Sequence, residues 1–126
     1  MSRTLKVSGF LGLTVQMLWG IGNVASHMVG TPDNWAQIVG AHAHFGVLGI
    51  LAVATGFAVD HYGTSGTRET VVVWGYVLGQ WLLPGTLVLQ AVTGVQPLGM
   101  LAFLWGILLA AAMGTMTLEA LDETPA

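Results

Sequence analysis

Four long stretches of this chain contain no Asp, Glu, Lys or Arg, and they constrain its fold more than any other feature. They cover residues 7–29, 37–59, 71–92 and 97–118. Each has about 20 residues, which is the length that a helix rising about 1.5 Å per residue needs to cross roughly 30 Å of hydrocarbon. The sequence therefore predicts a single all-α domain over residues 1–126, an integral membrane four-helix up-down bundle embedded in a lipid bilayer.

The composition excludes several classes of protein. Only 7% of the 126 residues are charged and 54% are hydrophobic, whereas a soluble domain carries about 25% charged residues. The chain has three basic residues and no basic patch, so we expect no nucleic-acid partner. It has no cysteine, which rules out disulfides, thiolate ligands and covalently attached c-type haem.

The basic residues predict how the helices are oriented. Arg3 and Lys6 precede the first span and Arg68 follows the second, so all three lie at one end of an up-down bundle. The positive-inside rule then places both termini in the cytoplasm of a multi-pass protein of the cell membrane. At the opposite end, Thr31 and Pro32 are expected to cap and begin the second helix.

Polar side chains in the first span share one face. At 100° per residue, Gln16, Asn23 and His27 lie close to one line with Gly9 and Gly20. Amide and imidazole groups that face lipid would have no hydrogen-bond partner. This face is therefore expected to contact protein or a cofactor.

The second span carries two histidines that point in different directions. His42 shares a face with Gly46 and Gly49, whereas His44 lies about 200° away, on a face with bulkier residues such as Leu48. A histidine above a row of glycines suits a flat macrocycle whose iron the imidazole binds. The other interpretation is that the glycines seat a neighbouring helix and His42 makes an interhelical hydrogen bond.

The available ligands favour haem over a bare metal ion. Two histidines two residues apart diverge on a helix, and the spans contain no carboxylate to complete a zinc or iron site. A haem supplies four nitrogens and needs one or two histidines. We take His42 as the first choice of ligand, with His44 and His27 as alternatives. The expected haem pocket is lined by Gln16, Asn23, His27, Gly46 and Gly49.

The third and fourth spans leave two interpretations open. Pro84 cannot donate a backbone hydrogen bond, so the carbonyl of Gln80 is freed and a kink is expected there. The kink either shapes a small-molecule pocket or is accommodated by packing. The small residues of the fourth span are typical of helix packing or an oligomer surface.

One segment resembles a known family. The stretch "W…AHAHFGVLGILAVATGF", followed by "GQWLLPG" in the third span, resembles the styrene oxide isomerases over residues 35–90. The resemblance implies a four-helix membrane enzyme that binds haem b through a histidine early in its second helix. It also implies a homotrimer, and ferric haem that acts as a Lewis acid on epoxides.

The alignment with that family leaves the ligand open. Alignment from Ala41-His42 places the family's ligand on His42, and alignment through Ala43-His44-Phe45-Gly46 places it on His44. The family's pocket asparagine falls on Leu48 or Ile50, and its tyrosine falls near Leu87. The family's ligand position thus has a histidine in this sequence, whereas its pocket asparagine and tyrosine have no counterpart at the aligned positions.

The leading hypothesis is a haem b membrane protein that acts on a small, apolar, oxygen-containing substrate such as an epoxide. The alternatives are a haem protein for electron transfer or for gas or redox sensing, and a cofactor-free membrane interaction or transport subunit.

Overall fold

In a computed structural model, residues 1–122 are described and form four helices. The helices are α1 (Ser2–Val29), α2 (Trp35–Tyr62), α3 (Gly66–Thr93) and α4 (Pro97–Asp122). All four are long and apolar enough to cross a membrane, and no strand occurs within residues 1–122. The predicted all-α membrane fold is confirmed. Glu123, in the acidic C-terminal segment, lies outside the described residues.

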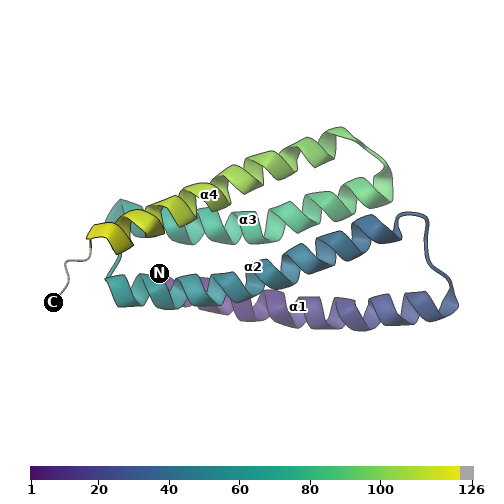
Figure 1. The fold of residues 1–126 in the computed structure, drawn as a ribbon, viewed down its shortest axis with the longest axis horizontal. Coiled ribbons are helices and arrows are strands. Elements are labelled where there is room, and N and C mark those ends of the chain that lie inside the picture. Colours follow the sequence, from purple (N-terminus) through teal and green to yellow (C-terminus); the bar gives the residue numbers. More distant parts are fainter. Residues whose placement is uncertain (123–126) are drawn as a thin grey trace.

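The helices alternate in direction as two neighbouring hairpins (Figure 1). Helix α1 packs along α2, α3 packs along α4, and α2 and α3 join the hairpins, whereas α1 and α4 do not contact each other within the described residues. The start of α1, the end of α4 and the α2–α3 connection lie at one end, here called the terminal end. The other two connections lie at the opposite, distal end.

Backbone conformation explains where two of the helices stop. Gly63 and Gly94 follow α2 and α3 with φ of 64° and 70°. This left-handed backbone conformation is strained for residues that carry a Cβ atom, so glycine there ends a helix at little cost in free energy.

The predicted start of the second helix at Thr31 and Pro32 is wrong. Pro32 lies in a turn in which its carbonyl accepts a hydrogen bond from the Trp35 N–H at 3.0 Å, and α2 begins at Trp35. Asn34 occupies the N-cap position, but its Nδ2 donates to the carbonyl of Ala91 at 2.8 Å. The side chain that was free to cap α2 instead ties the α1–α2 connection to α3.

The core is concentrated in the terminal half of the bundle. There α1 and α2 approach so closely that a Cβ atom on Gly9 would lie 2.7 Å from the carbonyl oxygen of Gly49. Small residues permit such close backbone contact between membrane helices. The main buried cluster consists of Leu5, Ala52, Val59, Val72, Val73, Tyr76, Ala112 and Met116.

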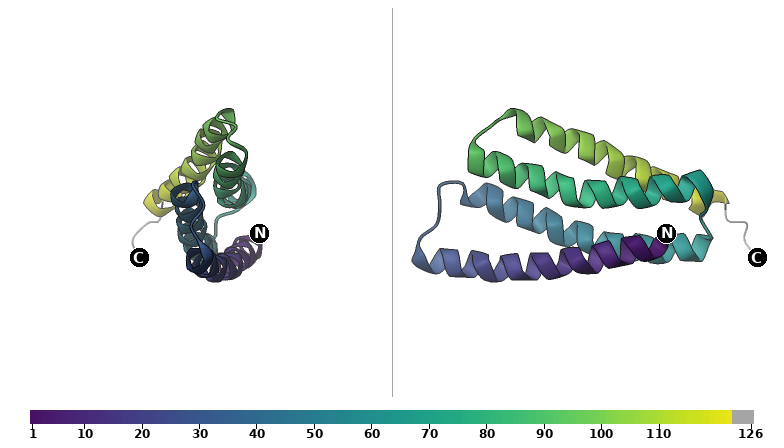
Figure 2. Two further views of the ribbon diagram at one scale, coloured as in Figure 1. Left: turned by 90° about the vertical axis from the view of Figure 1, so that its right-hand side faces the viewer. Right: turned by 180° about the vertical axis from the view of Figure 1, so that it is seen from behind.

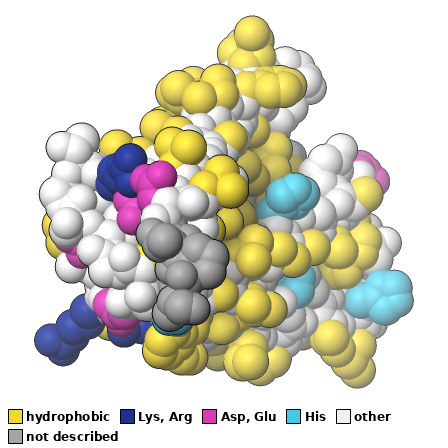
Figure 3. All heavy atoms as spheres, turned by 60° about the vertical axis from the view of Figure 1, so that its left-hand side comes forward, with side chains coloured by type: hydrophobic (Ala, Val, Ile, Leu, Met, Phe, Trp, Pro, Cys, Tyr) yellow, Lys and Arg dark blue, Asp and Glu magenta, His cyan; other side chains and the backbone are white. Residues whose placement is uncertain are grey.

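The helices spread apart towards the distal end (Figure 2). Their outer surfaces are strongly apolar, with Met28 81% exposed and Val29 89% exposed. In a bilayer these surfaces face lipid, whose hydrocarbon is a favourable environment for apolar side chains but not for charged ones. Figure 3 shows a face on which hydrophobic side chains predominate and histidines occur singly among them.

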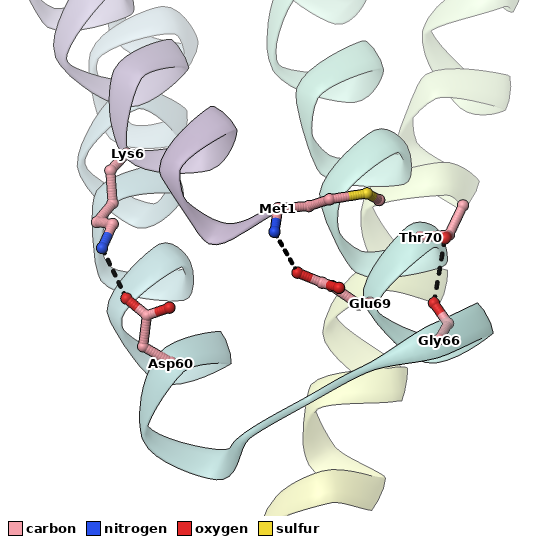
Figure 4. Close-up of polar contacts among 6 residues, drawn as sticks. All are labelled: Met1, Lys6, Asp60, Gly66, Glu69 and Thr70. Atoms are coloured by element: carbon pink, nitrogen blue, oxygen red, sulfur yellow. Dashed lines mark hydrogen bonds and ion pairs between the residues drawn. The ribbon is translucent and has the colours of Figure 1, made fainter.

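Ion pairs join the helices at the terminal end. Lys6 Nζ lies 2.6 Å from Asp60 Oδ2, and the Met1 amino group pairs with Glu69 (Figure 4). Arg68 Nη1 lies 3.0 Å from Glu119 Oε1 and 2.9 Å from Asp122 Oδ2, which ties the end of α4 to α3.

Candidate functional site

The polar face of α1 is turned towards α2. The Gln16 side chain lies over Gly46, where an added Cβ atom would come within 3.0 Å of its amide carbon. A Cβ atom on Gly20 would lie 3.4 Å from His42 Nε2. Asn23 is half-buried further along the helix, and its side chain makes no hydrogen bond to residues 1–122. In this structure Gln16 and Gly20 of the predicted polar face therefore contact α2, whereas the Asn23 amide is not paired within residues 1–122.

His42 is engaged by α1. Its Nε2 lies 3.0 Å from the backbone carbonyl of Gln16, and because a carbonyl only accepts, this nitrogen carries the proton and donates. The ring also meets Trp19 edge-on, with centroids 5.7 Å apart. Gln16 covers Gly46 and Leu13 covers Gly49, so helix α1 occupies the row of glycines next to His42.

His27 and His42 contact different residues. Its exposed ring stacks on Trp35 at the start of α2, with centroids 6.1 Å apart and planes inclined by 27°. The structure thus joins His42, Gln16 and the glycines in one interhelical seam, and it pairs His27 with an aromatic ring at the distal end.

His44 has a different environment. The side chain is exposed, and its Nδ1 lies 2.8 Å from the carbonyl of Gly40, one turn earlier on the same helix. The carbonyl accepts, so Nδ1 carries a proton, and in the neutral imidazole Nε2 keeps its lone pair. A backbone carbonyl that holds one ring nitrogen in this way orients the other nitrogen for ligation.

Two hollows meet at His44. The first, here called the vestibule, has a volume of about 370 Å³ between the distal ends of α2 and α3 and is lined by Gln37, Gly40, Ala41, His44, Leu87, Gln90, Ala91, Gly94 and Gln96. The second, here called the lipid groove, has a volume of about 380 Å³ and is lined by His44, Leu83, Leu87, Ala102, Phe103, Gly106 and Ile107. His44 therefore stands where an amide-rich hollow meets an apolar one.

Two glycines help to keep these hollows open. A Cβ atom added to Gly40 or to Gly106 would meet nothing within 4 Å. The sequence signal for this site was Gly40, one turn before His44, but the row of glycines after His42 is the more conspicuous pattern. The glutamines at 90 and 96 come from α3 and the α3–α4 connection, so no pattern within α2 reveals them.

The arrangement is unsuited to a bare metal ion. Within residues 1–122 no three His, Cys, Asp or Glu side chains are grouped closely enough to hold one. Haem has no such requirement, because its own four nitrogens leave a single histidine sufficient.

A buried polar cluster links α1 to α3 and was not predicted. Ser8 Oγ donates to Gln80 Oε1 at 3.0 Å, Gln80 Nε2 donates to the Ser8 carbonyl at 3.1 Å, and Trp81 Nε1 donates to Ser8 Oγ at 2.8 Å. Gln80 is fully buried, and α3 runs without interruption through Pro84. These groups satisfy one another, so the cluster is a structural link between the hairpins.

Comparison with known proteins places the chain in a family. The family model described as a domain of unknown function, DUF8059, matches residues 1–126. The chain belongs to the DUF8059 family. No curated protein and no solved structure matches it.

Proposed function

We propose that this DUF8059 membrane protein binds haem b and that His44 is the axial ligand. The observation behind this proposal is the hydrogen bond from His44 Nδ1 to the Gly40 carbonyl, which leaves the Nε2 lone pair directed away from the helix's own backbone. His42 is the weaker choice in this geometry, because its Nε2 already donates to Gln16 and α1 covers its glycines.

The lipid groove suits a flat apolar macrocycle. Leu83, Leu87 and Phe103 offer apolar contacts for the ring there, and the vestibule, which also meets His44, is left free for a second molecule. Bound ferric haem would supply a Lewis acid for a small oxygen-containing substrate, as the resemblance to styrene oxide isomerases implies.

The presence of a single histidine at the lipid groove favours binding of a substrate or a gas over electron transfer. Two axial histidines leave no open position on the iron and are typical of electron transfer. Here His42 faces α1 and His27 stacks on Trp35, so only His44 lines the two hollows. A site with one ligand supports binding of a substrate or a gas, and we place electron transfer second.

The deciding measurement is the absorption spectrum of protein purified after haem-replete expression. We expect a strong haem band that is lost in His44→Ala, partly restored by added imidazole, and retained in His42→Ala and His27→Ala. Loss of the band in His42→Ala alone would assign the ligand to His42. A colourless wild-type protein would contradict the haem proposal and favour a cofactor-free interaction or transport subunit.

A pair of glycine variants tests where haem binds while every histidine is kept. Gly106→Leu would fill the lipid groove, and because a Cβ there meets nothing within 4 Å, the fold should tolerate it. We expect this variant to lose haem. Gly114→Leu, also on α4 and equally open, is the matched control and should retain haem.

We also propose that the protein forms a homo-oligomer, a trimer by the resemblance. The exposed apolar side chains of α1 and α4, such as Ile21 and Phe103, are compatible with contacts between copies as well as with lipid. Native mass spectrometry from detergent is expected to show trimers, and a monomeric mass at all concentrations would contradict this.

A further inference from the structure

We infer that the vestibule is a binding chamber for a small, uncharged, hydrogen-bonding molecule that enters from the aqueous phase at the distal end. The inference deepens the proposed function, on which it rests for the role of His44, because it names the class of molecule admitted to that histidine. The chamber itself is testable without haem.

The position of the vestibule supports entry from water. Its rim carries the exposed side chains of Gln37 and Gln96, which lie at the first turn of α2 and in the α3–α4 connection. Gln37, Ala41 and His44 are spaced i, i+4, i+7 and share one face of α2. At 1.5 Å per residue, His44 lies about 10 Å below the rim. The chamber thus leads from the membrane surface to an imidazole within the span.

The lining offers both donors and an acceptor. The Gln37 amide makes no hydrogen bond to the described residues. Gln90 Nε2 donates to Gln96 Oε1 at 3.2 Å, which leaves the Gln96 amide N–H groups for another partner. The acceptor is the Oε1 atom of the same unpaired Gln37 amide. A molecule that carries a hydroxyl, ether or amide oxygen can satisfy these groups.

The absence of charge in the lining selects against ions. None of the residues that line the vestibule is Asp, Glu, Lys or Arg. A charged molecule that moved down towards His44 would lose its hydration shell without gaining a counter-charge, and this transfer is costly. A neutral molecule loses only the hydration of its polar atoms, and hydrogen bonds to the glutamine amides compensate for that loss.

The volume limits the size of the occupant. The vestibule measures about 370 Å³, whereas a cavity of about 150 Å³ is enough to bind benzene. The chamber therefore has room for a molecule of up to about twice the size of benzene, and not for a lipid.

The absence of cysteine makes the test direct, because an introduced cysteine is the only thiol in the chain. Gln37→Cys, His44→Cys and Leu51→Cys place a thiol at the rim, at the floor and two turns deeper on the same face of α2. Haem-free protein in liposomes is treated from either side with methanethiosulfonate reagents that are neutral, anionic or cationic.

We expect every reagent to modify Gln37→Cys from the distal side. The neutral reagent should also modify His44→Cys, and charged reagents should react there about tenfold more slowly or less. Leu51→Cys should stay unmodified. Failure of the neutral reagent to reach His44→Cys, or equal rates for neutral and charged reagents, would overturn the inference.

A blocking variant and a ligand probe complete the design. Gly40→Phe, at a position with no neighbour within 4 Å, should slow modification of His44→Cys while leaving Gln37→Cys reactive. N-methylacetamide, as a neutral probe, should protect His44→Cys more than acetate does, and equal protection would contradict selection for neutral molecules. A protein without a haem band that still shows this labelling pattern would refute the proposed function and retain the chamber.

Discussion

Gln80 is the polar side chain that depends most on its hydrogen-bond partners in this bundle. It is fully buried between α1 and α3, where its two amide atoms bond to Ser8 and the neighbouring Trp81 bonds to the same serine hydroxyl. In a membrane no bulk water can replace these partners. The side chain therefore stabilises the contact between the hairpins only as long as every group in the cluster stays paired.

Replacement of Gln80 by Leu is expected to destabilise the fold. It removes two hydrogen bonds and takes away the acceptor for the Ser8 hydroxyl, which costs about 1–3 kcal/mol in the free energy of unfolding. The measurement is reversible unfolding in mixed detergent micelles. Gln37→Leu is the matched control, since that amide makes no hydrogen bond to the described residues, and it should unfold like the wild type. Equal stability of the two variants would contradict a structural role for Gln80.

The two histidines show what could be predicted at the scale of single residues. The helical period alone separates His42 from His44, and the structure gives them different surroundings. The period cannot say which of them has space beside it, because a row of glycines suits a packed helix and a flat cofactor equally well. That choice depends on where α1, α3 and α4 lie, which is tertiary information.

At the scale of elements, the α1–α2 pair is held by close backbone approach. A Cβ atom on Gly49 would lie 3.1 Å from Leu13 Cγ and 3.3 Å from the Gly9 carbonyl. The bond between His42 and Gln16 extends this seam towards the distal end. The two helices therefore behave as one hairpin whose spacing is set by residues without side chains.

Gly49→Val is expected to push α1 away from α2. The added methyl groups overfill the seam, which costs about 1–3 kcal/mol in the free energy of unfolding. Gly22→Val provides the control, because a Cβ there meets nothing within 4 Å. Thermal unfolding of both variants in the same detergent gives the comparison. A Gly22 variant that is destabilised as much as the Gly49 variant would show that the seam is not the cause.

The helices themselves were predictable because hydrocarbon thickness fixes their length. Each observed helix contains the corresponding charge-free stretch and continues past it into the polar interface, as α3 does from Gly66 to Thr93. The start of α2 was not predictable from its cap signals. Asn34 bonds to Ala91 of α3, and a contact between residues 57 positions apart leaves no local signature.

At the scale of the whole molecule, charge separates the two ends of the bundle. The ion pairs of Lys6, Asp60, Arg68 and Glu119 lie at the terminal end, and the three basic residues of the chain all lie there, in the first turns of α1 and α3. The positive-inside rule predicts that this end faces the cytoplasm.

Single cysteines in the two kinds of connection test this orientation. Thr31→Cys, at the distal end, is expected to react with a membrane-impermeant maleimide in intact cells. Ser65→Cys, in the α2–α3 connection, should react only after the cells are permeabilised. The opposite pattern would reverse the assigned topology and would place the vestibule on the cytoplasmic side.

The tight terminal half and the spread distal half give the molecule unequal cross-sections at its two ends (Figure 2). A body of this shape displaces more lipid from one leaflet than from the other. Lateral pressure in the distal leaflet then acts directly on the spacing of the helices around His44. Lipids that change this pressure should alter the width of the lipid groove without binding to it. Membrane curvature should then affect how readily a molecule reaches His44.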